Sequence, residues 1–129
     1  MRTTPQKDRR PKYLDLLHIK LPITGIVSIA HRASGVLLVL SIPVWLYLLE
    51  TSLTSEQDFQ DVVKMTDGIA FKVMAIVVFW SLVHHFFAGI RFLLLDVDVA
   101  IEKRSALKAA KLVLIAEAVV MLFVVGWII

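Results

Sequence analysis

The chain has no cysteine among its 129 residues. This absence excludes a disulfide, a thiolate metal site and a cysteine nucleophile within the chain. Charged residues are also scarce, at 19% of the sequence, whereas hydrophobic residues make up 58% and the mean hydropathy is +0.78. Ordinary soluble domains are roughly 45–50% apolar, so this excess is too large for a small globular core. The composition predicts an integral membrane protein, and the length predicts a single domain over residues 1-129.

Three long stretches lack charge almost completely. Residues 33–49 carry none, residues 73–90 carry no acidic residue, lysine or arginine, and residues 112–129 carry only Glu117. A spanning helix requires about 20 mostly apolar residues, which each stretch reaches with modest extension. Helix is expected because lipid cannot satisfy the backbone groups of open strands. The predicted fold is therefore an all-α membrane protein with three transmembrane helices, at 23-49, 69-96 and 109-129, joined by loops at 50-68 and 97-108.

The distribution of charge predicts the orientation of these helices. The first 22 residues carry six lysines and arginines, and basic residues also follow the second helix. The 50-68 loop instead carries five acidic residues against Lys64 alone. The positive-inside rule then places the N-terminus and the 97-108 loop in the cytoplasm, and the acidic loop and the C-terminus on the outer side.

The first 22 residues do not resemble a cleaved signal peptide, because no compact apolar core with a small-residue cleavage site follows the basic residues. Leu14, Leu17 and Leu21 recur at near-helical spacing beside Asp15 and Lys20. Residues 1-22 are therefore predicted to form a cytoplasmic tail followed by a short amphipathic segment that lies in the cytoplasmic interface.

A polar stripe opens the first predicted helix. Ser28, His31, Arg32 and Gly35 are offset by 3, 4 and 7 residues, which places them on one helical face. Arg32 keeps its proton, and an unpaired charge in lipid is costly. One interpretation is that Arg32 reaches back to the lipid headgroups. The other, favoured by three polar groups at one depth, is that the stripe lines a site.

The second predicted helix carries two histidines, His84 and His85, which point about 100° apart. Gly89 follows His85 by one turn, and a planar ring approaching His85 requires such a small neighbour. This pattern indicates haem, bound through an imidazole nitrogen. Arg91 lies about 9 Å further along the axis, so we expect Arg91 and Arg32 to meet the haem propionates. The alternative is that each histidine only donates a hydrogen bond to another helix.

Two of these stretches resemble known signatures. Arg10–Pro11 followed by "SIAHRAS", Ser28 to Ser34, resembles the first signature of the succinate dehydrogenase cytochrome b subunit, bacterial type. "HFFAGIRFLLLD", His85 to Asp96, resembles its second signature. The similarity covers essentially the whole chain.

The resemblance implies the large membrane-anchor subunit of respiratory complex II, in the bacterial inner membrane. Such a subunit packs with a second, small anchor subunit, which supplies the other haem ligand, and the two share one haem b. The pair seats the iron–sulfur and flavoprotein subunits on the cytoplasmic face and passes electrons from succinate to ubiquinone. The chain then belongs to an enzyme but carries out no succinate chemistry itself. Membrane lipid is a further expected partner, and nucleic acid is not.

The resemblance also implies roles for single residues. His85 matches the axial ligand of the haem iron, and Ser28 and Arg32 match quinone-binding residues. His31 and Arg32 match residues near the haem propionates. Asp96 matches an acidic position associated with proton delivery to the quinone.

The sequence departs from the family pattern at several positions. Lys12 follows the Arg–Pro pair, Leu95 precedes the aspartate, and Phe92 stands where some relatives have a histidine. His84 and Glu117 match no family role. A structural anchor or assembly subunit without haem is therefore one alternative. Another is a proton or ion pathway that uses Glu117, His84 and His85 as a relay, which is disfavoured because the other ionisable groups gather near one end.

Overall fold

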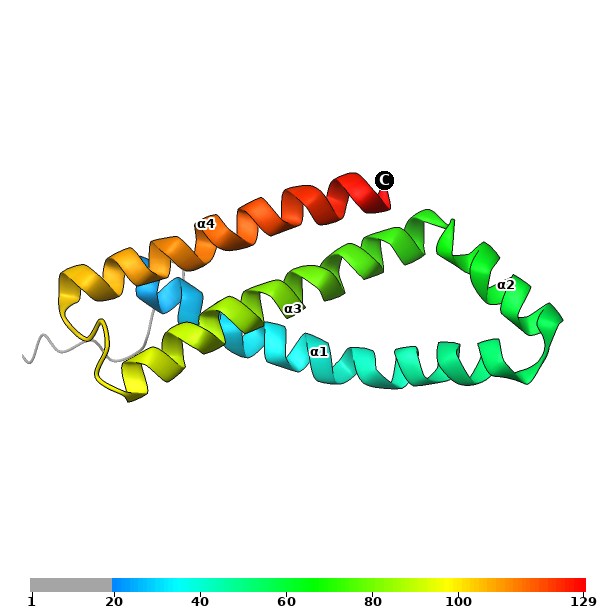
Figure 1. Cartoon of the computed structure of the whole chain (residues 1–129), viewed down its shortest axis with the longest axis horizontal. Helices are drawn as coiled ribbons and strands as arrows, with labels where there is room; N and C mark the ends of the chain where they lie inside the picture. Colours follow the sequence, from blue (N-terminus) through cyan, green and yellow to red (C-terminus); the bar gives the residue numbers. More distant parts are fainter. Residues whose placement is uncertain (1–19) are drawn as a thin grey trace, which may run out of the picture.

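The computed structural model describes residues 20–129. They form four helices, α1 (Ile23–Thr54), α2 (Glu56–Thr66), α3 (Ile69–Asp96) and α4 (Lys103–Ile128), with no strand in this part of the chain (Figure 1). By length and composition, α1, α3 and α4 can each cross a membrane. The prediction of an all-α membrane protein with three spans is thereby confirmed. The expected interfacial segment of residues 1-22 lies outside the described residues, apart from its last three.

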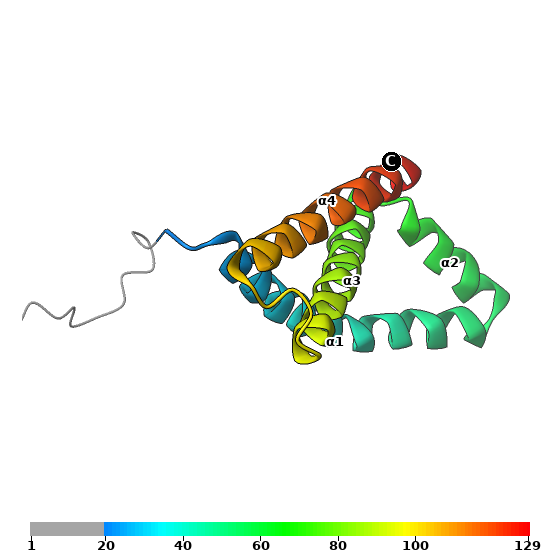
Figure 2. The ribbon, with the colours of Figure 1, turned by 60° about the vertical axis from the view of Figure 1, so that its left-hand side comes forward.

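α3 lies between α1 and α4 in the bundle (Figures 1 and 2). The start of α1, the end of α3 and the start of α4 converge at one end, which we call the closed end. Val27, Ala88, Ala110 and Val113 form the buried core there. At the opposite end α1 and α3 diverge, and α2 bridges them. Most large apolar side chains along the three long helices are exposed, as expected for surfaces that face lipid or another subunit.

α2 occupies much of the predicted 50-68 loop. The Ser55 hydroxyl accepts a hydrogen bond from the Asp58 backbone N–H at 3.1 Å, which caps the first turn. Lys64 lies in the last turn, where a cation favours the helix dipole. Hydrogen bonds from Lys64 and Gln57 lower the pKa of the exposed Asp61 carboxyl below its ordinary value, so this carboxylate stays ionised. The connection is therefore a capped polar helix, not an irregular loop.

The long helices also extend beyond some of the predicted bounds. α1 continues to Thr54 through Pro43, and α4 begins at Lys103 instead of residue 109. α3 covers the residues assigned to the second span. The connection from α3 to α4 is consequently short, and it includes two non-glycine residues with positive φ, Asp98 at 60° and Ala100 at 63°.

Candidate functional site

The imidazole of His85 on α3 is held by α1. Its Nδ1 lies 3.2 Å from the His31 backbone carbonyl and 3.2 Å from the Ser34 hydroxyl oxygen. The Ser34 hydroxyl itself donates to the same carbonyl at 2.8 Å, so its oxygen is left to accept. Both neighbours of Nδ1 are therefore acceptors, which assigns the hydrogen to Nδ1. The lone pair of Nε2 then remains available to a ligand or metal.

One ring stack and two glycines shape the surroundings of His85 and His31. The His31 ring stacks on the His85 ring, with centroids 4.1 Å apart and an angle of 14° between the planes. A Cβ at Gly35 would lie 3.1 Å from Cε1 of His85, whereas a Cβ at Gly89 would lie 3.6 Å from Nε2 of His31. Gly35 thus makes room for His85. Gly89, expected to leave space beside His85, lies against His31 instead.

An open groove of about 500 Å³ runs along α1 beside His85. No residue of α4 lines it, so it lies on the outer face of the α1–α3 pair. Within residues 20–129, no three histidine or carboxylate side chains gather as a metal site. The groove therefore offers two stacked imidazoles, those of His31 and His85, in an apolar wall with the Arg32 cation at its edge. Its lining residues are His31, Arg32, Gly35, Val36, Val39, Leu40 and His85.

The structure brings together only some of the predicted site residues. His31, Arg32 and His85 meet at the groove. Ser28 is partly buried one turn before Arg32 and does not line the groove, and Asp96 is exposed as the last residue of α3.

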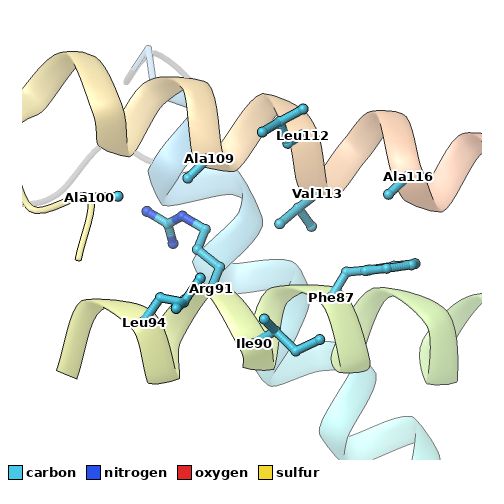
Figure 3. A pocket seen from close by; sticks show the side chains of 9 residues that line it. All are labelled: Phe87, Ile90, Arg91, Leu94, Ala100, Ala109, Leu112, Val113 and Ala116. Carbon is cyan, nitrogen blue, oxygen red and sulfur yellow. The ribbon is translucent and has the colours of Figure 1, made fainter. Parts of the chain in front are cut away.

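Arg91 is the site residue that lies elsewhere, in a separate pocket between α3 and α4 (Figure 3). Six residues of helix amount to about 600° of rotation, which leaves Arg91 about 120° around α3 from His85. The structure therefore does not bring Arg91 to the groove where it was expected to meet the propionates.

His84 points into the bundle, where it joins all three long helices. Its side chain is 1% exposed, and Nδ1 lies 2.7 Å from Oε2 of Glu117 on α4. Nε2 lies 3.4 Å from the Val27 carbonyl on α1, and the Trp80 indole N–H donates to Oε1 of Glu117. The Val27 carbonyl accepts the hydrogen on Nε2 of His84. Nδ1 of His84 and Oε2 of Glu117 would both be acceptors without a further proton, so one proton lies between them. The pair is thus neutral as a unit, which suits a lipid-embedded bundle.

The comparisons with known proteins agree with this architecture. The model of the succinate dehydrogenase/fumarate reductase transmembrane subunit family matches residues 6–125. The chain belongs to this family. A relative named succinate dehydrogenase cytochrome b556 subunit, from Coxiella burnetii, is 35% identical over 89 residues, which is 68% of this chain and 71% of the relative. The resemblance to the cytochrome b anchor subunit of succinate dehydrogenase is thereby confirmed.

Reasoning from the sequence missed Ser34 in this family member, and it named Glu117 only in the relay alternative without assigning its partners. Ser34 follows His31 by three residues, so its place on the His31 side of the helix was a usable signal. Glu117 is the only charge in residues 112–129, and such a residue in a span usually has a partner. Its partners lie 33 and 37 residues away in sequence, which no local pattern reveals.

Glu117→Ala should destabilise the bundle, because it leaves His84 and Trp80 without their shared acceptor. Orphaned buried groups cost about 1–3 kcal/mol each, so we expect the loss of two such partners to lower the free energy of unfolding by about 2–6 kcal/mol. Denaturant titration of the detergent-solubilised complex measures it. Glu50→Ala, at an exposed acidic residue, is the matched control. In a double-mutant cycle with His84→Ala, additive losses would show that the two side chains do not interact.

Proposed function

We propose that this chain is the haem b-containing anchor subunit of succinate dehydrogenase and helps to pass electrons from succinate to ubiquinone. The observation that carries the proposal is the His85 imidazole. Its Nδ1 is bound to the His31 carbonyl and the Ser34 hydroxyl, and its Nε2 is free at the edge of an open groove. A histidine that ligates metal typically donates its other N–H to a carbonyl or similar acceptor in this way.

The residues around the groove fit a haem. His85 Nε2 would bind the iron, and the apolar wall of Val36, Val39 and Leu40 suits the macrocycle. His31 Nε2 is buried without a hydrogen-bond partner among residues 20–129. This nitrogen and the Arg32 guanidinium would bind the haem propionates. Arg91 would not contribute to this binding, because it lies in a separate pocket. When bound, a haem supplies reversible one-electron transfer.

The open side of the groove supports a partner subunit. Within residues 20–129, one histidine nitrogen that is not buried, Nε2 of His85, lies toward the groove, and a haem with two histidine ligands requires another. We infer that the second, small anchor subunit covers the α1–α3 face and supplies that ligand. The exposed apolar residues along this face of α1, such as Val36, Val39 and Leu40, suit burial against its helices.

The charge distribution supports the proposed orientation in the inner membrane. The closed end carries exposed Lys103, Arg104, Lys108 and Lys111 at the start of α4, whereas α2 at the other end is acidic. The positive-inside rule places the closed end in the cytoplasm and the C-terminus in the periplasm. The iron–sulfur and flavoprotein subunits would then dock at the closed end, near Arg32 and Asp96.

A cysteine introduced at Gln60 should report this orientation. Gln60 is exposed on α2, and the chain has no cysteine of its own. Ser55 is less suitable because its hydroxyl caps α2. We expect Gln60→Cys to react with a membrane-impermeant thiol reagent added to the periplasmic side. A cysteine at Arg104 should react only after the membrane is opened. The reverse pattern would show that the orientation is inverted.

A reduced-minus-oxidised spectrum of the purified complex tests the proposed function. The proposal requires a b-type haem that succinate reduces and ubiquinone reoxidises. An assembled complex without haem would instead support the alternative of a structural anchor.

Gly35→Ala should perturb this spectrum. The added Cβ would lie 3.1 Å from Cε1 of His85, closer than ordinary van der Waals contact, so the imidazole must shift. We expect a displaced Soret or α band, or reduced haem occupancy. Gly126→Ala is the matched control, because a Cβ there meets nothing within 4 Å. An unchanged spectrum in an assembled Gly35→Ala complex would mean that His85 does not bind haem in the orientation described.

A further inference from the structure

Arg91 is a buried cation without a counter-charge in the described part of the chain. Its side chain is 7% exposed, and its Nε has no hydrogen-bond partner. No acidic side chain of residues 20–129 pairs with it. The Phe92 ring lies 5.2 Å from Cζ, which attracts the charge but accepts no conventional hydrogen bond. A guanidinium at this depth requires an anion, because an unpaired charge there is costly.

The pocket around Arg91 is almost wholly apolar. It has a volume of about 210 Å³ and lies between the facing surfaces of α3 and α4 (Figure 3). Ile90 and Leu94 line it from α3, and Ala109, Leu112 and Ala116 line it from α4. Ala109 and Ala116 leave space that larger residues would fill. A ligand suited to this pocket therefore combines an anionic group with an apolar chain.

The pocket lies near the end of α3 that the proposed orientation places at the cytoplasmic boundary of the membrane. Arg91 lies five residues before the end of α3, which is about 7–8 Å along the helix axis. Lys108 and Lys111 are exposed and adjoin the lining residues Ala109 and Leu112 in sequence, and basic residues at the cytoplasmic end attract anionic lipids. The pocket is also separate from the haem groove, with which it shares no lining residue.

We propose that this pocket binds one anionic phospholipid, with its phosphate on the Arg91 guanidinium and an acyl chain between α3 and α4. Guanidinium and phosphate form paired, charge-assisted hydrogen bonds. The acyl chain would cover the apolar lining that a free anion leaves exposed. The phospholipid thereby neutralises the buried cation and fills the space between the two helices.

Lipid retention by the purified complex tests the proposal. Wild-type, Arg91→Gln and Arg104→Gln complexes are delipidated and exchanged into vesicles of phosphatidylcholine with phosphatidylglycerol. They are then repurified, and the retained lipids are measured by mass spectrometry. Losing one charge-assisted contact costs about 1.5–3 kcal/mol. We therefore expect Arg91→Gln to retain at most about one tenth of the phosphatidylglycerol that the wild type retains. Arg104 is exposed at the same end and does not line the pocket, so Arg104→Gln should retain it normally.

A second variant keeps the proposal testable if Arg91→Gln does not assemble. Ala116→Leu fills the pocket without changing charge and should also lose phosphatidylglycerol. Equal retention by the wild type and either assembled variant would overturn the proposal. The melting temperature of the wild type should also rise more with phosphatidylglycerol than with inorganic phosphate. An equal rise with inorganic phosphate would overturn the proposal, because the site would then bind a free anion. The haem spectrum, recorded on the same samples, tests the proposed function separately.

Discussion

His85→Ala is expected to abolish the b-type haem spectrum of the assembled complex. The imidazole is the one nitrogen ligand that the described part of the chain directs toward the groove, and Ser34 and the His31 carbonyl orient it from α1. Alanine removes that ligand, and the other imidazole at the groove, that of His31, has its Nε2 buried. The measurement is the dithionite-reduced-minus-oxidised spectrum of the complex, normalised to its flavin content. His85→Gly with added imidazole should restore part of the signal, because the free base replaces the missing ligand.

The neighbouring histidine provides the matched control. His84 is bonded to Glu117 and to the Val27 carbonyl on the far side of α3, so His84→Ala should lower stability but retain the haem spectrum. If His84→Ala abolishes the spectrum and His85→Ala retains it, the rotation of α3 described above is incorrect. If both variants retain it in an assembled complex, a residue other than His84 and His85 binds the haem iron.

Much of the fold could be predicted because a membrane span is encoded locally. Uninterrupted apolar stretches alone locate α1, α3 and α4. α2 was missed because its acidic composition indicates an external loop, although a serine at position 55 followed three residues later by Asp58 is typical of a helix start. The start of α4 was placed too late because Lys103 and Arg104 lie in its first turn, where cations are unfavourable for a helix.

The candidate site was predictable only where one helix defines it. The i, i+3, i+4 spacing correctly places His31 and Arg32 on one side of α1, and both line the groove beside His85. The expectation for Arg91 relied on its axial distance from His85 and ignored rotation around the helix, which turns it toward α4. The contacts of Ser34 with His85 and of His84 with Glu117 depend on how the helices pack, and sequence spacing carries no information on that packing.

Arg32→Leu and Ser28→Ala are each expected to slow succinate–ubiquinone turnover strongly. A quinone carbonyl gains negative charge as it is reduced, and a preorganised cation or hydroxyl lowers the energy of that charge. Arg32 is exposed at the groove, and Ser28 lies one turn closer to the closed end, where the iron–sulfur subunit is proposed to dock. Losing one such donor typically costs about 10²–10³-fold in rate. Asp96, exposed at the same end, would help to deliver the protons that quinol formation requires.

Matched variants separate a quinone role from a structural one. Ser41→Ala removes a hydroxyl of α1 that donates only to the Leu38 carbonyl, and Arg104→Leu removes an exposed arginine from the same end of the bundle. Both should keep normal turnover. Succinate oxidation by an artificial acceptor at the soluble subunits should persist in every variant, and co-purification of these subunits with the membrane chain shows that the complex is assembled. Arg32→Leu should also shift the haem spectrum, since Arg32 is proposed to bind a propionate, whereas Ser28→Ala should not.

Normal ubiquinone turnover in an assembled Ser28→Ala, Arg32→Leu double variant would exclude both residues from the quinone site. Arg32 would then be an anchor that reaches to the headgroups and fixes the orientation of α1.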